Sequence, residues 1–218
     1  MSLYYNKTRR VTVRRRAGRG VYDRETIDAI LDEGFVGHLA FTADDQPYAV
    51  PMLYARGEGE LFLHGSPLSR LIRSAASGIP VCFTVTLIDG IVFARSAFHH
   101  SVNYRSVVVL GTARPITDRE EKHEALRMVV ENVAAGRSDD ARGPSDKELA
   151  ATEVLTLAIQ EASAKVRSGP PIDAAEDYGL PVWAGELPLK LVPGEPVPDD
   201  RCAAPEPAYL RAWGHAYA

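Results

Sequence analysis

The feature that most constrains the fold is a succession of β-like runs separated by turn-forming residues. Residues 35–42 and 48–55 are rich in apolar side chains, and the sequence "ADDQP" between them favours a turn. "RGEGE" then turns the chain into a short run at residues 61–64. A regular alternation of strands and helices is missing, which argues against a doubly wound parallel sheet. We therefore predict a mainly β fold, an antiparallel barrel with a few helices packed outside it.

A second set of β-like runs lies in the middle and later parts of the chain. Residues 80–88 and 91–96 flank Asp89-Gly90, a pair typical of two-residue hairpin turns. The sequence thus predicts a β-hairpin at this point. Further strands are expected at residues 106–113, 154–160, 164–167 and 187–192.

The peripheral helices are predicted from their capping residues. Asp23 and Asp118 each precede a segment with apolar residues at helical spacing. Ser66, followed by Pro67 at the first helical position, is expected to begin another helix, which ends at Gly78.

The composition fits one globular domain with appendages. The 218 residues are 45% hydrophobic and 25% charged. We place a basic arm at residues 1–20, the domain at residues 21–192 and a proline-rich tail at residues 193–218. The net charge of −4 argues against nucleic-acid binding by the whole surface. A solvated arm or an edge strand is the simpler interpretation of the basic segment, and an arm that binds nucleic acid is the alternative.

The cysteines and the apolar runs bear on location. Cys82 and Cys202 lie far apart and show no zinc-binding spacing, so we expect neither a metal site nor a disulfide framework. The N-terminus has no secretory apolar region, and the apolar stretch at residues 79–94 is too short to span a bilayer. We expect a cytoplasmic protein without a membrane partner.

The first candidate site is "LFLHGSPLSR". A strand would end at His64, and the following helix start would present free N–H groups that favour an anion. Ser66 and Ser69 add hydroxyl groups, and Arg70 adds a guanidinium suited to phosphate oxygens. A helix start without a ligand is the alternative.

The second candidate is "RSAFHHSVNYRSVVVLG", where polar groups precede an apolar run. On an extended chain Asn103 and Arg105 face one way and Tyr104 the other, so one face can reach a ligand. A capped strand start is the alternative. His99 and His100 are adjacent, but no third metal ligand has an obvious spacing.

The third candidate is "PYAVPMLYA". Pro51 has no N–H group, so an interrupted ladder is expected there, with nearby backbone groups free to bind a ligand. A β-bulge is the alternative.

Together these segments resemble the pyridoxamine 5′-phosphate oxidase-like family of FMN-binding split barrels. The resemblance is carried in order by "GHLAF", "QPYAVPMLYA", "ELFLHGSPLSR", "VCFTV" and "NYRSVVVLGTARPI", and is similar to the branch that includes nitroimidazole-resistance proteins. "ASAKVRSGPP" and "LPVWAGELPL" match the later part of that branch. The resemblance implies a six-stranded antiparallel split β-barrel, a homodimer, and FMN in clefts at the dimer interface.

The resemblance also implies which residues border the cofactor. The backbone of Val50, Pro51, Met52 and Leu53 would lie along the flavin ring. The phosphate end would be held by His64, Ser66, Ser69 and Arg70, with His64 also a candidate for chemistry. The cofactor would further be bordered by Asn103, Tyr104, Arg105, Lys165, Arg167 and Trp183.

One departure narrows the expected activity. The enzyme that gives the family its name has an adjacent Arg-Lys pair, whereas Arg70 is followed here by Leu71. We therefore expect an FMN-dependent oxidoreductase that reduces a small organic, for instance nitro-aromatic, substrate with NAD(P)H as a potential donor. Synthesis of pyridoxal phosphate is not expected. The alternatives are a flavin-storage protein and a haem-binding split barrel in which His64, His99 or His100 ligates iron.

Overall fold

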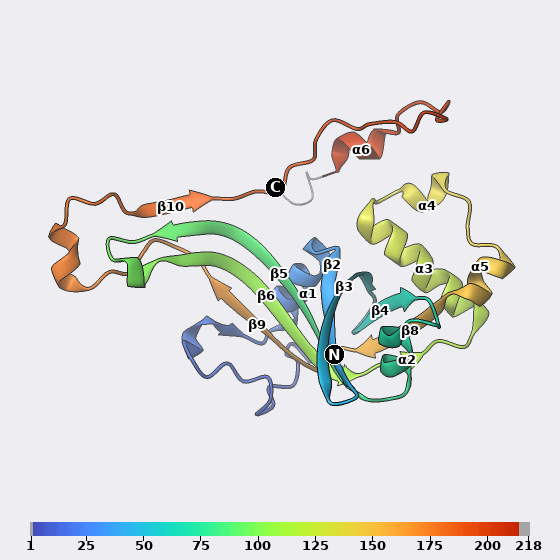
Figure 1. The fold of residues 1–218 in the computed structure, drawn as a ribbon, viewed down its shortest axis with the longest axis horizontal. Coiled ribbons are helices and arrows are strands. Elements are labelled where there is room, and N and C mark those ends of the chain that lie inside the picture. Colours follow the sequence, from blue (N-terminus) through green and yellow to red (C-terminus); the bar gives the residue numbers. More distant parts are fainter. Residues whose placement is uncertain (1, 214–218) are drawn as a thin grey trace.

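The strands form one curled antiparallel sheet, against which the helices pack (Figure 1). The computed structural model describes residues 2–213. The hydrogen-bonded order is β1-β9-β6-β5-β2-β3-β4-β8-β7, and β10 pairs with β5. The strands are β1 (Gly20–Val21), β2 (Val36–Ala43), β3 (Gln46–Arg56), β4 (Glu60–Gly65), β5 (Pro80–Phe93), β6 (Ser101–Thr112), β7 (Arg114–Pro115), β8 (Glu153–Ala158), β9 (Glu161–Arg167) and β10 (Gly185–Pro188). The predicted antiparallel split barrel is confirmed, with short additional strands that extend the sheet beyond the six expected.

The hairpin predicted at Asp89-Gly90 is wrong. Residues 80–93 form the single strand β5, which pairs with β6 along its length and shifts register between Ile88 and Gly90. The two residues therefore form a β-bulge rather than a turn. The bulge also changes which side chains face inward, because odd-numbered residues such as Val85 are buried before it and even-numbered ones such as Val92 after it.

Strand β6 begins five residues earlier than predicted, at Ser101. The polar stretch that contains Asn103, Tyr104 and Arg105 thus lies inside the strand and not ahead of it. Beyond the bulge, β5 and β6 extend as a long curved pair away from the β2–β3 region, and β10 runs beside them (Figure 1).

The helices pack against the sheet, and the first of them lies on its inner face. Asp23 accepts a hydrogen bond from the Thr26 backbone N–H, and Asp118 from that of Glu121, as their predicted capping roles require. The helices are α1 (Arg24–Glu33), α2 (Arg70–Ala76), α3 (Arg119–Val133), α4 (Arg137–Asp140), α5 (Asp146–Ala151) and α6 (Ala208–Ala212), with 3-10 turns η1 (Ala17–Arg19), η2 (Ala97–His99) and η3 (Ala175–Gly179).

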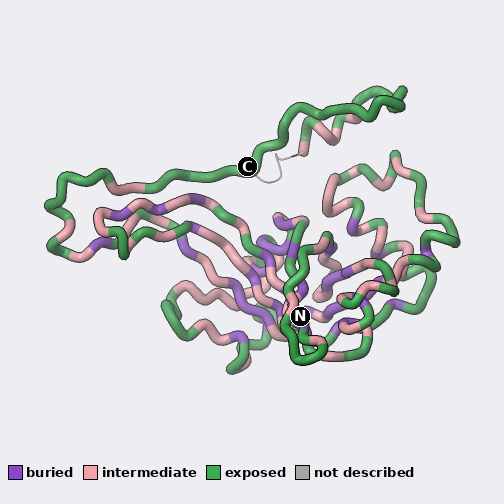
Figure 2. Tube along the Cα trace, viewed as in Figure 1, coloured by how far each residue is buried: buried purple, intermediate pink, exposed green. Residues whose placement is uncertain are grey.

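The main core lies between α1 and the inner face of the sheet, where buried residues follow the strands (Figure 2). Gly37 permits its tightest packing, because a Cβ at that position would come within 2.1 Å of the Phe83 ring. A smaller cluster joins α3 to β3, β4 and β8 through Ala55, Phe62 and Val129. Helix α3 is therefore fixed firmly against the sheet.

The N-terminal arm is mostly exposed but is attached to the domain at a few residues. Tyr5 and Val11 are buried, and Thr8 donates a hydrogen bond to Glu161 on β9. Residues 9–14 contain turns and no strand, so an edge strand is not present in that part of the arm. The C-terminal segment after β10 is largely exposed until α6 (Figure 2). Within residues 2–213, no helix is long and apolar enough to cross a membrane.

Candidate functional site

Strand β3 offers an open edge next to the barrel. Its residues 46–53 pair with β2, whereas its pairing with β4 is confined to residues 54–56. The predicted ladder interruption at Pro51 is wrong, because Pro51 pairs in register with His38 and no bulge occurs there. A proline is tolerated where its nitrogen faces an unpaired edge. Val50, Pro51 and Leu53 are exposed, so this edge is accessible to a ligand, as predicted.

The turn after β4 differs from the prediction in where its helix begins. Helix α2 starts at Arg70, and its N-cap is Ser69, whose Oγ accepts from the Ile72 N–H. Ser66 lies before the helix and accepts from the Leu68 N–H. Both serine hydroxyl groups thus stabilise the turn in this structure.

Arg70 is brought next to the open edge of β3. Its guanidinium lies 4.9 Å from the centre of the Tyr48 ring and donates to the Tyr48 hydroxyl. Tyr48 is itself stacked on Phe41 at 5.3 Å. Since Arg70 is exposed and has no carboxylate partner within the described chain, its cation is available to an anion beside β3.

Asn103 is held inside the protein. It is 6% exposed, and its Nδ2 donates to Glu186 Oε2 at 2.6 Å and to the Gly169 carbonyl at 3.3 Å. Its Oδ1 accepts from Arg167 Nη1. Asn103 therefore joins β6, β9 and β10. The sequence pattern alone fits this structural role as well as it fits ligand binding.

Arg105 forms an ion-paired cluster with two carboxylates. It donates to Glu33 on α1 and to Asp89 in the β5 bulge, with Nη2 2.7 Å from an oxygen of each. These hydrogen bonds raise the pKa of the Arg105 guanidinium. The cluster lies beside a cavity of about 620 Å³ between β2, β5 and the segment after β10.

The remaining predicted residues lie toward the far end of the β5–β6 pair. Tyr104 is opposite Arg167 in the β6–β9 ladder, and Lys165 on β9 lines a second cavity with Arg167. Trp183 is 69% exposed and packs its ring 5.9 Å from that of Phe93. Within one copy of the chain, these residues are therefore not joined to Arg70 and the β3 edge in a single site.

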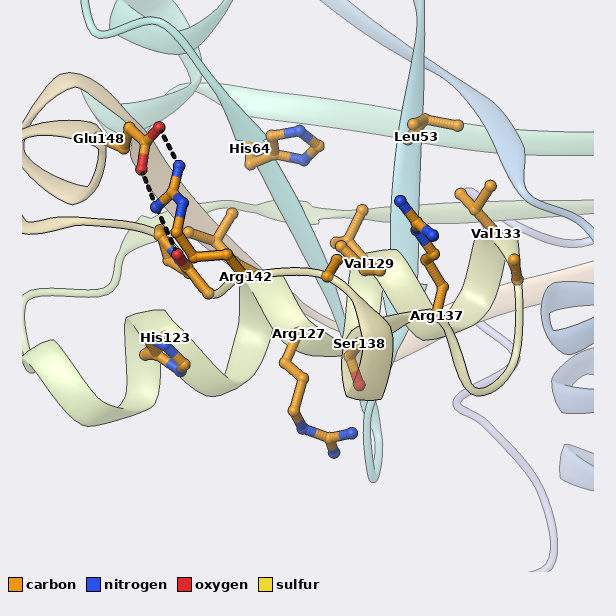
Figure 3. A pocket seen from close by; sticks show the side chains of 16 residues that line it. Leu53, His64, His123, Arg127, Val129, Val133, Arg137, Ser138, Arg142 and Glu148 are labelled. Atoms are coloured by element: carbon orange, nitrogen blue, oxygen red, sulfur yellow. Dashed lines mark hydrogen bonds and ion pairs between the residues drawn. The ribbon is translucent and has the colours of Figure 1, made fainter. Parts of the chain in front are cut away.

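A site feature that the sequence did not predict is a cavity between β3, β4 and α3, with a volume of about 640 Å³ (Figure 3). Its walls are mainly apolar and include Leu53, Leu126, Val129, Val130 and Val133. Apart from Leu53 on β3, these side chains lie on α3 at helical spacing. Helical spacing alone predicts an apolar face, and only the tertiary arrangement shows that part of this face lines a cavity while Ala125 and Val129 pack against the sheet.

His64 is one of the polar residues that line this cavity. Its Nδ1 is buried and has no hydrogen-bond partner among residues 2–213, and burial lowers the pKa of the ring. His64 thus stays neutral at physiological pH and retains a nitrogen lone pair. An apolar cavity with one neutral imidazole is suited to a hydrophobic ligand that carries a metal or needs one polar contact.

Three arginines line the same cavity and differ in their hydrogen-bond partners. Arg142 is paired with Glu148, and Arg127 with Glu124 on the exposed side of α3. Arg137 donates to the Tyr209 hydroxyl at 2.8 Å, which leaves most of its five N–H donors for another acceptor. Figure 3 shows Arg137 extending toward Leu53, whereas Arg127 and His123 point away from His64. Arg137 is therefore the cation placed to bind an anionic group at the cavity.

His99 and His100 do not join His64. Both line the second cavity, at the far end of the β5–β6 pair. His99 has potential metal-ligand atoms within 4.8 Å of those of Asp173 and Asp177, a third-ligand arrangement that the sequence spacing did not indicate. However, Asp173 accepts from the backbone and the guanidinium of Arg95, so its charge is already compensated there.

A comparison with protein families and solved structures gives consistent matches. The family model described as pyridoxamine 5′-phosphate oxidase matches residues 23–166. The structure of the flavocytochrome Anf3 from Azotobacter vinelandii is 38% identical, with a TM-score of 0.89 over 94% of this chain and 96% of that one. No curated protein sequence matches the chain.

Two further structures extend this comparison. A FAD and haem binding protein from Mycobacterium smegmatis is 37% identical, with a TM-score of 0.85 over 89% of this chain and 96% of that one. A putative 5-nitroimidazole antibiotic resistance protein from Bacteroides thetaiotaomicron is 24% identical, with a TM-score of 0.57 over 67% of this chain and 86% of that one. The last of these similarities concerns the fold alone.

Proposed function

The chain belongs to the pyridoxamine 5′-phosphate oxidase family, and on that premise we propose that it is a redox protein that binds both a flavin and a haem. The main support for the proposal is the apolar cavity at His64, which shares Leu53 with the open edge of β3 and is otherwise formed by β4, α3 and the segment after α3. Two structures that match nearly the whole chain are a flavocytochrome and a FAD and haem binding protein, and each is over 35% identical to it.

The cavity residues fit a haem. Its volume of about 640 Å³ lies within the range of roughly 300–1,000 Å³ typical of cofactor sites. Apolar side chains from α3 and β3 suit the faces of a porphyrin, and histidine is a common axial ligand of haem iron. The buried Nδ1 of His64 has no hydrogen-bond partner within residues 2–213, so one nitrogen of the imidazole is not engaged by the described chain. His64 would hold the iron, and Arg137 would bind a propionate carboxylate.

The β3 edge and Arg70 support a flavin site. A strand edge with free backbone groups can bond to the polar rim of a flavin ring, and the Arg70 guanidinium suits its phosphate. The family resemblance favours FMN, whereas the M. smegmatis relative binds FAD. Release of the flavin by heat and its identification by mass will distinguish the two, and we expect FAD because that relative covers almost the whole chain.

The residues of the chain would position these groups rather than perform the redox chemistry. A bound flavin supplies hydride and electron transfer, and a haem supplies one-electron exchange. His64 remains unprotonated because burial lowers its pKa, so its lone pair stays available to a metal. Val129, Val130 and Val133 would exclude water from the cavity and so favour a neutral imidazole. A small organic acceptor, such as the nitro-compound expected above, would take its electrons from the flavin.

The cofactor sites are expected to be completed by a second copy of the chain. Tyr104, Lys165 and Trp183 lie away from Arg70 in one copy, and many apolar side chains around β2, β3 and β10 are exposed. A homodimer would bring the far end of one β5–β6 pair near the β3 edge of its partner. Such a dimer would explain how residues that lie far apart in one copy could border the same cofactor, as the resemblance implies.

The test of the proposal is the absorption spectrum of the protein purified from cells supplied with riboflavin and a haem precursor. We expect flavin bands together with a Soret band, both altered by a chemical reductant. Turnover with NAD(P)H and a panel of acceptors would show an oxidoreductase, and full flavin loading without turnover would indicate storage instead. A colourless protein that takes up neither added flavin nor added haem would contradict the proposal.

Arg70→Ala tests the flavin site separately. The variant should bind flavin more weakly by about 1.5–3 kcal/mol, because a charged hydrogen bond to phosphate is lost. Arg73→Ala is the matched control, since Arg73 lies in the last turn of the same helix. Flavin dissociation constants measured by fluorescence for both variants should therefore differ. Equal affinities would show that Arg70 has no part in the site.

A further inference from the structure

Within one copy of the chain, a strongly cationic cleft lies away from the β3 edge and from the His64 cavity. It has a volume of about 500 Å³ and is formed by η1 and the preceding arm, η2, and the end of β9. Five cationic side chains line it: Arg15, Arg16, Arg19, Lys165 and Arg167. The chain as a whole has a net charge of −4, so this concentration of positive charge does not reflect the average composition.

The one carboxylate that lines the cleft does not neutralise these cations. Asp173 accepts hydrogen bonds from the backbone N–H of Arg95 at 2.9 Å and from its guanidinium at 3.0 Å. Arg95 does not line the cleft, so Asp173 forms its ion pair with a cation outside the cleft. The cleft therefore remains strongly positive.

Two side chains that line the cleft have unsatisfied buried nitrogens. Arg167 is only 6% exposed, and its Nε has no hydrogen-bond partner within residues 2–213. The Nδ1 of His99 is likewise buried and unpartnered in the described chain. Burial lowers the pKa of Arg167 and the nearby charge of Arg19 lowers it further, although Glu186 acts in the opposite direction. An anion at this place would relieve the repulsion and supply acceptors.

An aromatic side chain stands at the rim of the same cleft. Phe98 on η2 is 87% exposed, and its ring is 5.3 Å from that of His99. Exposed aromatic rings can serve as stacking platforms for nucleotide bases. A ring beside a group of cations suits a ligand with both a base and phosphates.

We propose that this cleft binds the diphosphate of a dinucleotide, with its base against Phe98. Such a diphosphate has two sources: a nicotinamide dinucleotide that acts as the electron donor, or the adenosine diphosphate half of FAD. The number of cations favours NADP(H), whose additional 2′-phosphate brings more negative charge than NAD(H) does. A role for this ligand in electron transfer rests on the proposed function, but its binding to the cleft does not.

The experiment is a calorimetric titration of the full-length protein, loaded with the cofactors it retains, with NADP⁺ and with NAD⁺. We expect NADP⁺ to bind more tightly. The double variant Arg15→Gln/Arg19→Gln should weaken NADP⁺ binding by about tenfold or more, because charged hydrogen bonds to phosphate are lost. The matched control is Arg9→Gln/Arg14→Gln, which removes the same charge from the same arm at residues that line a different hollow. A thermal melt of each variant verifies that it is folded.

The flavin content of the purified variants identifies the source. Unchanged flavin content with weakened NADP⁺ binding supports the nicotinamide dinucleotide. Loss of FAD from the cleft variant but not from the control, without NADP⁺ binding in either, supports the FAD diphosphate. Equal effects of both double variants, or no effect on either ligand, would overturn the proposal. So would tighter binding of a mixed-sequence single-stranded oligonucleotide than of NADP⁺. NADP⁺ binding is measured without turnover. The absence of flavin or haem from the protein would therefore contradict the proposed function, but the titration would still test whether the cleft binds NADP⁺.

Discussion

At the scale of single residues, Tyr5 shows how the N-terminal arm is fixed to the domain. Its hydroxyl donates to Asp28 Oδ1 at 2.6 Å, and the Arg24 guanidinium lies 4.1 Å from the centre of its ring. Burial, followed by the hydrogen bond to Asp28, raises the pKa of Tyr5 from 10.0 to about 12. The protonated form is thus favoured in the folded state.

This shift predicts a pH dependence of stability. Below pH 10 the contribution of Tyr5 is complete, and it is lost as the pH rises toward about 12, because the unfolded chain then releases the proton that the folded chain retains. The free energy of unfolding of the wild type should therefore approach that of Tyr5→Phe over this interval. Urea unfolding of both proteins at several pH values measures the difference. A constant difference would show that the hydroxyl is not shielded as described.

Individual polar side chains also show what the sequence pattern could not reveal about the candidate site residues. Asn103 and Arg105 are in a pattern that would suit a ligand, but the structure engages them with Glu186, Glu33 and Asp89. These partners lie 16 to 83 positions away in the sequence, so no local pattern could identify them. Conversely, His64 was selected from its place at a strand end, and its cavity is supplied by the distant helix α3.

At the scale of elements, most helices and strands could be predicted from local signals, whereas the bulge in β5 could not. Asp89-Gly90 has the composition of a hairpin turn, but β6 pairs with residues on both sides of it. Gly90 is required for a tertiary reason: a Cβ there would lie 3.0 Å from the Leu187 carbonyl oxygen and 3.4 Å from the Pro188 Cα. The close approach of β10, which local propensity does not encode, explains the glycine.

Gly90→Ala should accordingly weaken the attachment of β10. We expect a loss of about 1–3 kcal/mol in the free energy of unfolding, as is typical of overpacking, and faster hydrogen exchange at residues 185–188. Gly18→Ala is the control, because a Cβ at that position has no atom within 4 Å. If the two alanine variants exchange alike, the contact between β5 and β10 is not as close as described.

At the scale of the whole molecule, the exposed apolar surface is larger than an isolated chain would favour. Val36 on β2, Val50 and Leu53 on β3, Ile88 on β5 and Leu187 on β10 are all exposed by more than a third. Surfaces of this kind usually mark an interface. We therefore expect sedimentation to give twice the 23.8 kDa of one chain. A single species of 23.8 kDa that retains its flavin would contradict the homodimer.

The central claim is that His64 and the apolar face of α3 form a haem site. Its most direct test is a titration of haem into cofactor-free protein, followed by the Soret band, for the wild type, His64→Ala and His123→Ala. His123 borders the same cavity but points away from His64 (Figure 3). We expect one haem per chain with a histidine-ligated spectrum in the wild type and His123→Ala, and a lost or altered Soret band in His64→Ala. Identical spectra and affinities in all three proteins would contradict it.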